Sequence, residues 1–215
     1  IKAYLMENYH TNPADIYVTI NGIDTNKFCR EADASSVISE FSLSPDSKKI
    51  VYISRMDKDR AQLAFELVEI APEIVKEFPD IEIVIVGGGN VFLALQKKTE
   101  EMNKRLGSRR IILTGGRTDI YKFAALGDIF VGVSRSALEA MACEKPVIVA
   151  GNEGYIGIFD ETKLDSAIET NFCCRGLALS SCEKLLKDVK TLLNNSVDEN
   201  ARLGRFGREL ILNSY

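Results

Sequence analysis

The chain lacks the residues on which several common kinds of site depend. Its 215 residues include a single histidine, His10, and its five cysteines follow no zinc-ligand spacing. We therefore expect no metal site, and we expect the cysteines to be small buried or incidental side chains in a reducing cytoplasm. A G-x-S-x-G motif is also absent, and His10 is expected to lie in an exposed loop. A nucleophilic triad is not supported.

Neither charge nor hydrophobicity is concentrated in one segment. The net charge is −4, with no block of like charges, so the sequence gives no electrostatic footprint for binding nucleic acid. The longest apolar runs fall far short of the roughly 20 residues that span a bilayer, and no signal peptide is recognised. These absences predict a cytoplasmic globular protein.

The sequence does have a regular alternation of short apolar runs and amphipathic stretches. Runs that are buried on both faces are typical of parallel strands joined by crossover helices. The alternation therefore predicts an α/β fold with a doubly wound, Rossmann-like parallel sheet. Strands are expected within residues 15–20, 48–54, 81–89, 110–116, 128–133 and 145–151, and helices over residues 61–78, 91–106, 118–126, 181–194 and 198–213, with one more from Ser134.

The regular pattern is interrupted at a few places that suggest boundaries. Residues 24–48 are polar and weakly periodic, as in a linker, and residues 152–175 are also loosely patterned. The sequence begins at Ile1 inside an apparent helix and ends in helical periodicity, so we expect a piece of a longer chain. This predicts a junction and linker over 1–47, a sheet domain over 48–195 and a final helix over 196–215.

Glycines follow two of the expected strands, at the edge where such sheets bind ligands. They include Gly87 and Gly88, within a run of three, and Gly116. We expect all three to line a nucleotide site. The G-x-G-x-x-G pattern is absent, which disfavours NAD, and a tight strand–helix turn explains the triple glycine equally well.

Arg55 and Arg60 follow the strand within 48–54. Guanidinium groups form paired hydrogen bonds with phosphate oxygens, and their charge offsets the charge that develops on a departing diphosphate. The alternative is a solvated turn in which Asp57 and Asp59 neutralise the two arginines.

Two helix starts also invite both a local and a functional interpretation. At Thr114–Tyr121, backbone groups beside Gly116 and Arg117 can grip the edge of a nucleobase, whereas Thr118 can equally be an N-cap. At Ser134, a helix N-terminus is a ready anion site. Ser136 and Glu139 also fit a capping box, and Glu139 is placed to reach a ribose; these two interpretations are compatible.

The order of these strands, glycine loops, arginines and helix starts along the chain resembles that of the C-terminal half of a GT-B glycosyltransferase of the large retaining family 4. The stretch "IYVTINGIDTNKF" resembles the family's junction motif, and "ISRMDKDRAQLAFELVEIAP" resembles its GRL-x-x-x-KG loop, with Arg55 and Arg60 at the basic positions. The most specific piece is "LEAMACEKPVIVA". The resemblance covers nearly the whole chain.

The resemblance implies a role for each candidate residue. Arg55 and Arg60 would contact the donor diphosphate, and Gly116 and Arg117 the base. The helix start formed by Ser134, Arg135 and Ser136 would face the phosphates, and Glu139 would bind the ribose hydroxyls.

Two positions depart from the family pattern. The family usually carries an E-x7-E pair whose first acid lies near the donor sugar, but Val131 stands eight residues before Glu139. Ser54 replaces the usual glycine before the arginine.

The implied activity is retaining transfer of a sugar from a UDP- or GDP-sugar to an unknown acceptor. No cofactor or metal is implied. Residues 48–195 would bind the donor, and residues 196–215 would cross back to a preceding N-terminal domain. That domain would bind a sugar or lipid-linked acceptor and make any membrane contact, so this chain alone would be inactive. The alternatives are a nucleotide-sugar 2-epimerase of the same fold and a non-catalytic nucleotide-binding module.

Overall fold

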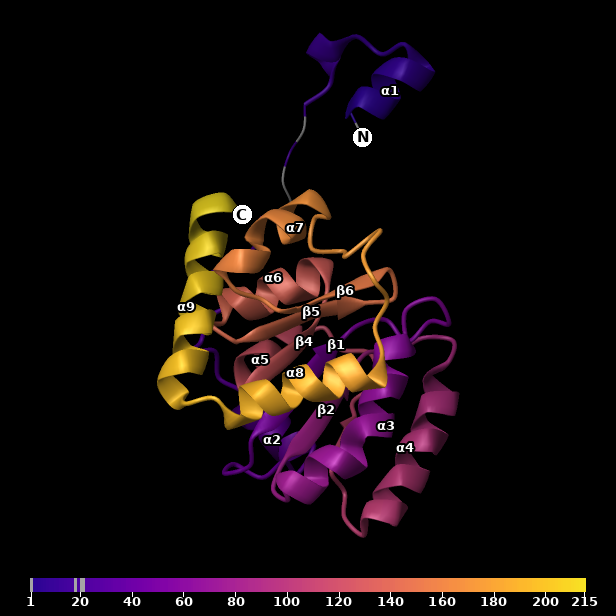
Figure 1. Ribbon diagram of the computed structural model, residues 1–215, viewed down its shortest axis with the longest axis vertical. Helices are drawn as coiled ribbons and strands as arrows, with labels where there is room; N and C mark the ends of the chain where they lie inside the picture. The colour runs from indigo at the N-terminus through magenta and orange to yellow at the C-terminus, as the bar shows by residue number, and fades with distance from the viewer. Residues whose placement is uncertain (1, 18, 20–21) are drawn as a thin grey trace.

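The computed structural model describes residues 2–17, 19 and 22–215, and it forms one mixed sheet between layers of helices (Figure 1). In the described chain the sheet has six strands in the order β3-β2-β1-β4-β5-β6. The strands are β1 (Lys49–Ile53), β2 (Glu82–Val86), β3 (Ile111–Leu113), β4 (Ile129–Gly132), β5 (Val147–Gly151) and β6 (Gly154–Ile158). Strands β1 to β5 are parallel, and β6 is antiparallel to β5 at one edge.

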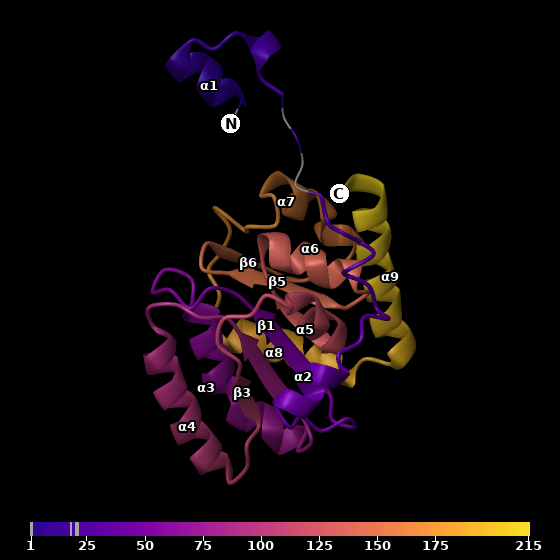
Figure 2. The same ribbon diagram turned by 180° about the vertical axis from the view of Figure 1, so that it is seen from behind.

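Helices cover both faces of this sheet. One face carries α3 (Gln62–Glu77), α4 (Phe92–Leu106) and α8 (Cys182–Asn194); the other carries α2 (Ser35–Glu40), α5 (Ile120–Leu126) and α6 (Ser134–Ala142), as Figures 1 and 2 show from opposite sides. Helix α9 (Val197–Ser214) packs along α6, and α7 (Leu164–Glu169) follows β6. Helix α1 (Lys2–Tyr9) buries none of its residues.

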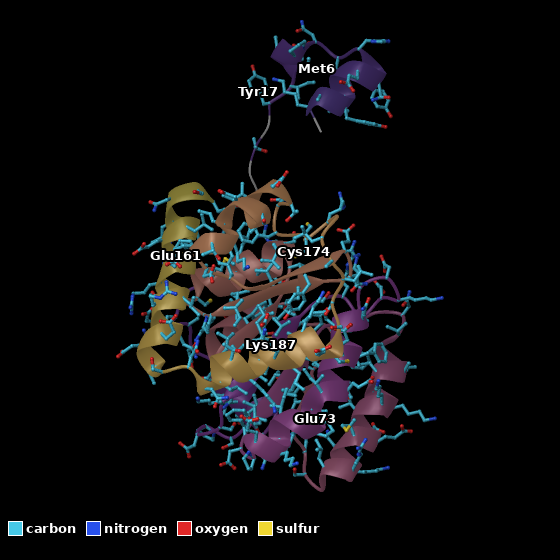
Figure 3. All side chains as sticks on the ribbon, viewed as in Figure 1. Met6, Tyr17, Glu73, Glu161, Cys174 and Lys187 are labelled. Carbon is cyan, nitrogen blue, oxygen red and sulfur yellow. The ribbon has the colours of Figure 1, made fainter. Side chains whose placement is uncertain are left out.

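The core consists of two apolar layers, one on each side of the sheet. Successive strand residues point to opposite faces, so Ile50 and Tyr52 of β1 pack toward α3 and α8, whereas Val51 and Ile53 pack toward α5 and α6. All residues of β1, β2, β4 and β5 are buried, as expected for parallel strands covered on both faces. Charged side chains such as Glu73 and Lys187 stay on the outer surfaces of α3 and α8 (Figure 3). The predicted doubly wound, Rossmann-like α/β fold is confirmed.

Three expectations about individual segments are wrong. No strand forms in the described part of 15–20, because Pro13–Asp15 is a 3-10 turn and residues 16, 17 and 19 are irregular; residues 18 and 20 lie outside the described residues. The presumed linker 24–48 contains α2, with Val37 fully buried. The loosely patterned segment 152–175 contains β6, the 3-10 turn Glu161–Lys163 and α7. The two glycines of β6 interrupt its apolar pattern, so the sequence did not indicate a strand there.

In the part of the chain that the structure describes, no helix combines the length and the apolarity needed to cross a bilayer.

Candidate functional site

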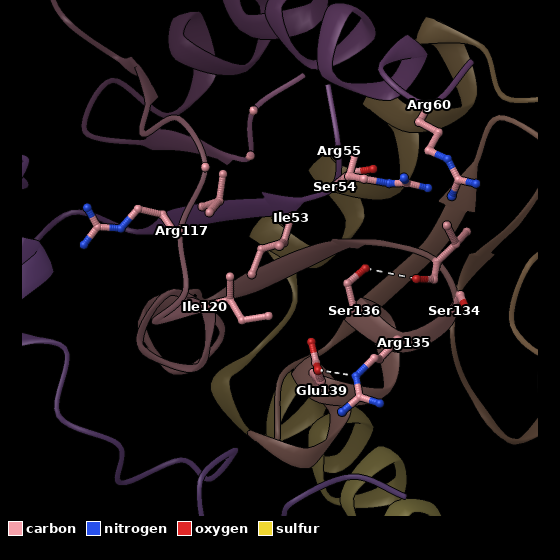
Figure 4. Close-up of a pocket in the computed structure, with 15 residues that line it drawn as sticks. Ile53, Ser54, Arg55, Arg60, Arg117, Ile120, Ser134, Arg135, Ser136 and Glu139 are labelled. Atoms are coloured by element: carbon pink, nitrogen blue, oxygen red, sulfur yellow. Dashed lines mark hydrogen bonds and ion pairs between the residues drawn. The ribbon is translucent and has the colours of Figure 1, made fainter. Parts of the chain in front are cut away.

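The sheet has a topological switch point between β1 and β4. From β1 the chain continues through β2 to β3 on one side, whereas β4 and β5 lie on the other. The loops leaving β1 and β4 therefore diverge and leave a crevice beyond the carboxyl ends of the strands. A cavity of about 860 Å³, which we call the main cavity, opens there (Figure 4). Its volume falls in the range of small-molecule sites.

The main cavity brings together every residue that the sequence nominated. Its lining includes Arg55, Arg60, Gly87, Gly88, Gly116, Arg117, Ser134, Arg135, Ser136 and Glu139. Four parallel strands deliver these residues to one edge, since each nominated segment follows the carboxyl end of β1, β2, β3 or β4. The binding role of each residue stays a prediction.

The two arginines after β1 differ in their surroundings. Arg60 lies 3.7 Å from Asp59, and both side chains are largely exposed. Asp57 does not pair with an arginine; its carboxylate accepts a hydrogen bond from the N–H of Asn90 at 3.1 Å and so holds the glycine loop. Among the described residues, Arg55 has no acidic partner within ion-pair distance. Neutralisation by neighbouring acids therefore accounts for Arg60 only.

The glycine loop after β2 packs directly against the loop after β1. Gly87 has a φ of +142°, and a Cβ there would lie 1.8 Å from the carbonyl oxygen of Ser54. The N–H of Met56 also donates to the carbonyl of Gly88 at 2.9 Å. Because Gly87 has no side chain, the two backbones approach closely and their polar groups form part of the cavity wall. The tight turn and the cavity wall are thus compatible uses of the same glycines.

Arg117 contributes to the cavity wall, but its guanidinium is occupied elsewhere. It forms paired hydrogen bonds with Glu40 at 2.6 and 2.9 Å and with Asp119 at 2.9 and 3.0 Å, and it lies over the rings of Phe41 and Phe123. Hydrogen bonds with Asp119 and Glu40 raise the pKa of Arg117, and the Arg117 guanidinium in turn lowers the pKa of Asp119. In Figure 4 the Arg117 side chain points away from the arginines of the β1 loop. The guanidinium therefore fastens α2 to the loop after β3.

The N-terminus of α6 forms the floor of the cavity beside the arginines. The predicted capping box is wrong: the helix starts at Ser134 without a side-chain cap, and the Ser136 hydroxyl donates to the Val133 carbonyl at 3.0 Å. The Ser134 N–H donates to the Phe172 carbonyl at 2.7 Å. The following amides of the first turn have no partner within the helix, which is the arrangement that attracts anions.

Glu139 is the buried acid of the cavity. It is 4% exposed, and its carboxylate accepts a hydrogen bond from the Arg135 Nε at 2.9 Å. Burial raises the pKa of Glu139, and the hydrogen bond from Arg135 opposes part of that rise. The second carboxylate oxygen has no partner among the described side chains and faces the cavity (Figure 4).

The sequence interpretation missed the apolar wall of the cavity. Ile53, Val86 and Val133 lie at or directly after the ends of β1, β2 and β4, and Ile120 begins α5. Their positions at strand ends are the signal that identifies such residues once the strand order is known. They add an apolar wall to the charged and polar groups of the cavity, and small-molecule sites combine both kinds of lining.

Known proteins resemble this chain in both sequence and fold. The family model described as Glycosyl transferases group 1 matches residues 47–195, well over half of the chain. A mannosyltransferase of Mycolicibacterium smegmatis, described as GDP-mannose-dependent and acting on phosphatidylinositol monomannoside, is 28% identical over 148 residues, covering 62% of this chain.

Similar solved structures share the fold. A glycosyltransferase from Rickettsia africae superposes with a TM-score of 0.71 at 19% identity, covering 100% of this chain and 56% of its own. Anabaena HepE, solved with UDP and glucose, superposes with a TM-score of 0.67 at 18% identity, covering 100% of this chain and 56% of the HepE chain. The C-terminal domain of the group 1 glycosyltransferase LpcC from Francisella tularensis gives 0.64 at 22% identity, covering 90% of this chain and 98% of that domain. The chain spans only 37% of the mannosyltransferase that it matches.

Proposed function

Because the chain belongs to the family of glycosyl transferases group 1, we propose that its main cavity binds the nucleoside diphosphate of a sugar donor. The whole protein would be a retaining, family 4 glycosyltransferase of GT-B architecture, and this chain would be its C-terminal, donor-binding part. The observation that carries the proposal is the convergence of two arginines, an uncapped helix N-terminus and a buried acid on one cavity at the switch point.

The two ends of the cavity suit the two ends of such a ligand. At one end, Arg55, Arg60 and the first turn of α6 supply positive charge and free N–H groups for a diphosphate (Figure 4). At the other end, the backbone around Gly116 and Arg117 would hold the base. Glu139 lies on α6 between them, where its free carboxylate oxygen would accept hydrogen bonds from ribose hydroxyls.

The same groups would assist the chemistry. When the bond between the sugar C1 and the diphosphate oxygen breaks, its electron pair stays on the diphosphate, and guanidinium groups and a helix dipole stabilise that charge without a bound metal. The acceptor hydroxyl then bonds to C1 on the same face and loses its proton, which the departing diphosphate is placed to accept. The acceptor, a sugar or a lipid-linked sugar, would be bound by an N-terminal domain in the cytoplasm.

Both UDP and GDP remain candidate nucleotides. The mannosyltransferase relative is described as GDP-mannose-dependent, whereas the Anabaena neighbour was solved with UDP. A non-catalytic nucleotide-binding module is the second candidate, because Val131 is fully buried in β4 where the family places an acid near the sugar.

Titration calorimetry with UDP, GDP, ADP and the matching nucleosides tests the proposal. We expect at least one diphosphate to bind, and we expect Arg55→Ala to weaken it about tenfold or more while the nucleoside loses little, since a charged hydrogen bond contributes about 1.5–3 kcal/mol. Arg60→Ala should cost less, because Asp59 already pairs with Arg60.

Arg105→Ala on the exposed side of α4 is the matched control and should bind like the unmodified chain. Absence of binding by every nucleotide at millimolar concentration would contradict the donor-site proposal. An equal loss of diphosphate and nucleoside affinity in Arg55→Ala would contradict the assignment of the phosphate end.

A further inference from the structure

A second hollow adjoins the main cavity, and nothing proposed so far uses it. This side hollow has a volume of about 480 Å³, and its polar lining includes Asp59, Arg60, Asn152, Glu153, Cys173 and Arg175. It shares Ser54, Arg60, Val133 and Ser134 with the main cavity, and it shares none of Gly88, Gly116, Arg117 or Glu139. The two spaces are therefore continuous only at the arginine and serine end, where the diphosphate would lie.

Three segments that are distant in sequence are joined around the side hollow. The Asn152 side-chain amide, in the β5–β6 turn, donates to the backbone carbonyl of Asp59 after β1. Arg175 forms a fork with Glu153, donating from Nε at 3.1 Å and from Nη2 at 3.2 Å. These contacts link the β1 loop, the β5–β6 turn and the loop after α7 into one polar rim.

The loop after α7 is held in a strained conformation. Asn171, Phe172 and Cys174 have φ values of 51°, 57° and 61°, in the left-handed region that costs such residues free energy. Packing compensates for this strain: Phe172 is fully buried against Phe159, and Cys174 is buried with its backbone carbonyl close against Gly154 at the start of β6. The conformation places Cys173 and Arg175 at the hollow and the Phe172 carbonyl on the first amide of α6.

The side chains of the hollow suit a neutral ligand that is rich in hydroxyl groups. Two carboxylates, Asp59 and Glu153, are balanced by two guanidinium groups, Arg60 and Arg175. Hydroxyl groups both donate and accept hydrogen bonds, so they satisfy carboxylates and guanidinium groups together. Because the four charges balance, the hollow exerts no net electrostatic attraction on a ligand with a fixed charge. The volume lies within the range for small ligands.

We propose that the side hollow binds the sugar of the donor, as an uncharged hexose, and that Glu153 and Arg175 hydrogen-bond its hydroxyls. This proposal rests on the proposed function, because it uses the diphosphate position to place the sugar. Glu153, on the β5–β6 turn, thereby supplies the acid that the sequence does not have at Val131. Glu153 and Arg175 are specificity-determining residues in this assignment, and Arg60 spans both spaces.

Alkylation of Cys173 reports directly on the side hollow, because this thiol lines it and is partly exposed. The chain is treated with iodoacetamide in saturating UDP, GDP, UDP-glucose or GDP-mannose, and each cysteine is followed by mass spectrometry. We expect at least one sugar nucleotide to slow alkylation of Cys173 several-fold relative to its own diphosphate. Cys182, which is equally partly exposed but outside both spaces, is the internal control and should not change.

Glu153→Gln provides the second measurement. We expect the ratio of sugar-nucleotide to diphosphate affinity to fall about tenfold, the loss typical of a hydrogen bond to a charged group, while diphosphate affinity stays within about twofold. Glu209→Gln, at an exposed position on α9, should leave both unchanged.

The outcomes separate the two proposals. If no nucleotide binds, the proposed function fails. If a diphosphate and its sugar nucleotide bind but protect Cys173 equally, or if Glu153→Gln leaves the affinity ratio unchanged, the sugar assignment is overturned while the nucleotide site stands.

Discussion

At the scale of single residues, Glu139 has the most informative surroundings. It is a buried acid whose pKa is raised mainly by burial, and a single guanidinium, from the half-exposed Arg135, offsets part of that cost. A structural ion pair would be expected to saturate both carboxylate oxygens, as Arg117 does with Glu40. Glu139 instead keeps one oxygen toward the main cavity, which is an arrangement suited to a ligand.

Glu139→Gln should therefore separate ligand binding from stability. We expect nucleotide affinity to fall about tenfold, because a neutral amide replaces a carboxylate that accepts ribose hydroxyls. Calorimetry with the nucleotide that binds best is the measurement. Unchanged affinity would contradict the ribose role.

The stability of the same variant should depend on pH with a defined sign. Because the folded pKa of Glu139 lies above its ordinary value of 4.5, the native state holds a proton through a pH window in which the unfolded chain has lost it. Glu139 therefore reduces the free energy of unfolding as pH rises through that window. Denaturant unfolding at several pH values should show Glu139→Gln gaining stability relative to the unmodified chain above the window and not below it.

At the scale of elements, α6 and α9 form one unit behind the cavity. Gly204 of α9 lies so close to the end of α6 that a Cβ would sit 2.1 Å from the carbonyl oxygen of Glu144. A Cβ on Gly207 would lie 3.0 Å from the Met141 side chain of α6. These two glycines let the backbone of α9 approach α6, and so they fix the position of the helix whose N-terminus would bind phosphate.

Gly204→Ala tests this packing because two effects oppose each other. In an open helix, alanine stabilises relative to glycine by up to about 1 kcal/mol. Here we expect destabilisation of about 1–3 kcal/mol from overpacking and a melting temperature lowered by several degrees. Gly22→Ala, where an added Cβ meets no atom of the described residues within 4 Å, is the control. An increase in melting temperature for Gly204→Ala would contradict the close approach.

At the scale of the whole molecule, the C-terminal helix is part of the core. Leu203 and Ile211 of α9 are buried, and the Arg208 guanidinium donates to the carbonyls of Thr25, Phe28 and Ala142. One side chain thus joins α9, the segment before α2 and the end of α6. The separate assignment of residues 1–47, 48–195 and 196–215 stays a prediction, and these contacts argue for testing it directly.

Truncation at each end should have opposite results. A chain ending at Asn195 loses the apolar face of α9 and exposes α6, so we expect a large loss of stability and a broadened thermal transition. A chain of residues 22–215 loses α1, which buries nothing, so its melting temperature should stay within about 2 °C, as for other exposed changes. Calorimetric scans of both chains provide the comparison. An unchanged, sharp transition without α9 would show that residues up to 195 fold independently.

The sequence by itself determined the sheet, and it indicated the charged residues and the glycines of the main cavity but not its apolar wall. Apolar runs such as those of β1 and β2 can be buried only in a sheet covered on both faces, and parallel strands bring their carboxyl ends to one edge. The sequence therefore predicts one site for residues as far apart as Arg55 and Glu139, and both line the main cavity. Local pattern placed Arg55 after a strand and Glu139 on the helix that follows another, and the resemblance to a glycosyltransferase family predicted that they share one site.

Only the tertiary structure decided which way side chains point and what lies beside the cavity. The Ser136 and Glu139 pattern predicted a capping box. In the structure, Arg135 instead donates a hydrogen bond to the Glu139 carboxylate, and the Ser136 hydroxyl donates to the Val133 carbonyl. Arg117 turns to Glu40, and the side hollow depends on the contact of Arg175 with Glu153 across two loops. Such pairings depend on packing between segments distant in sequence, and no local periodicity encodes them.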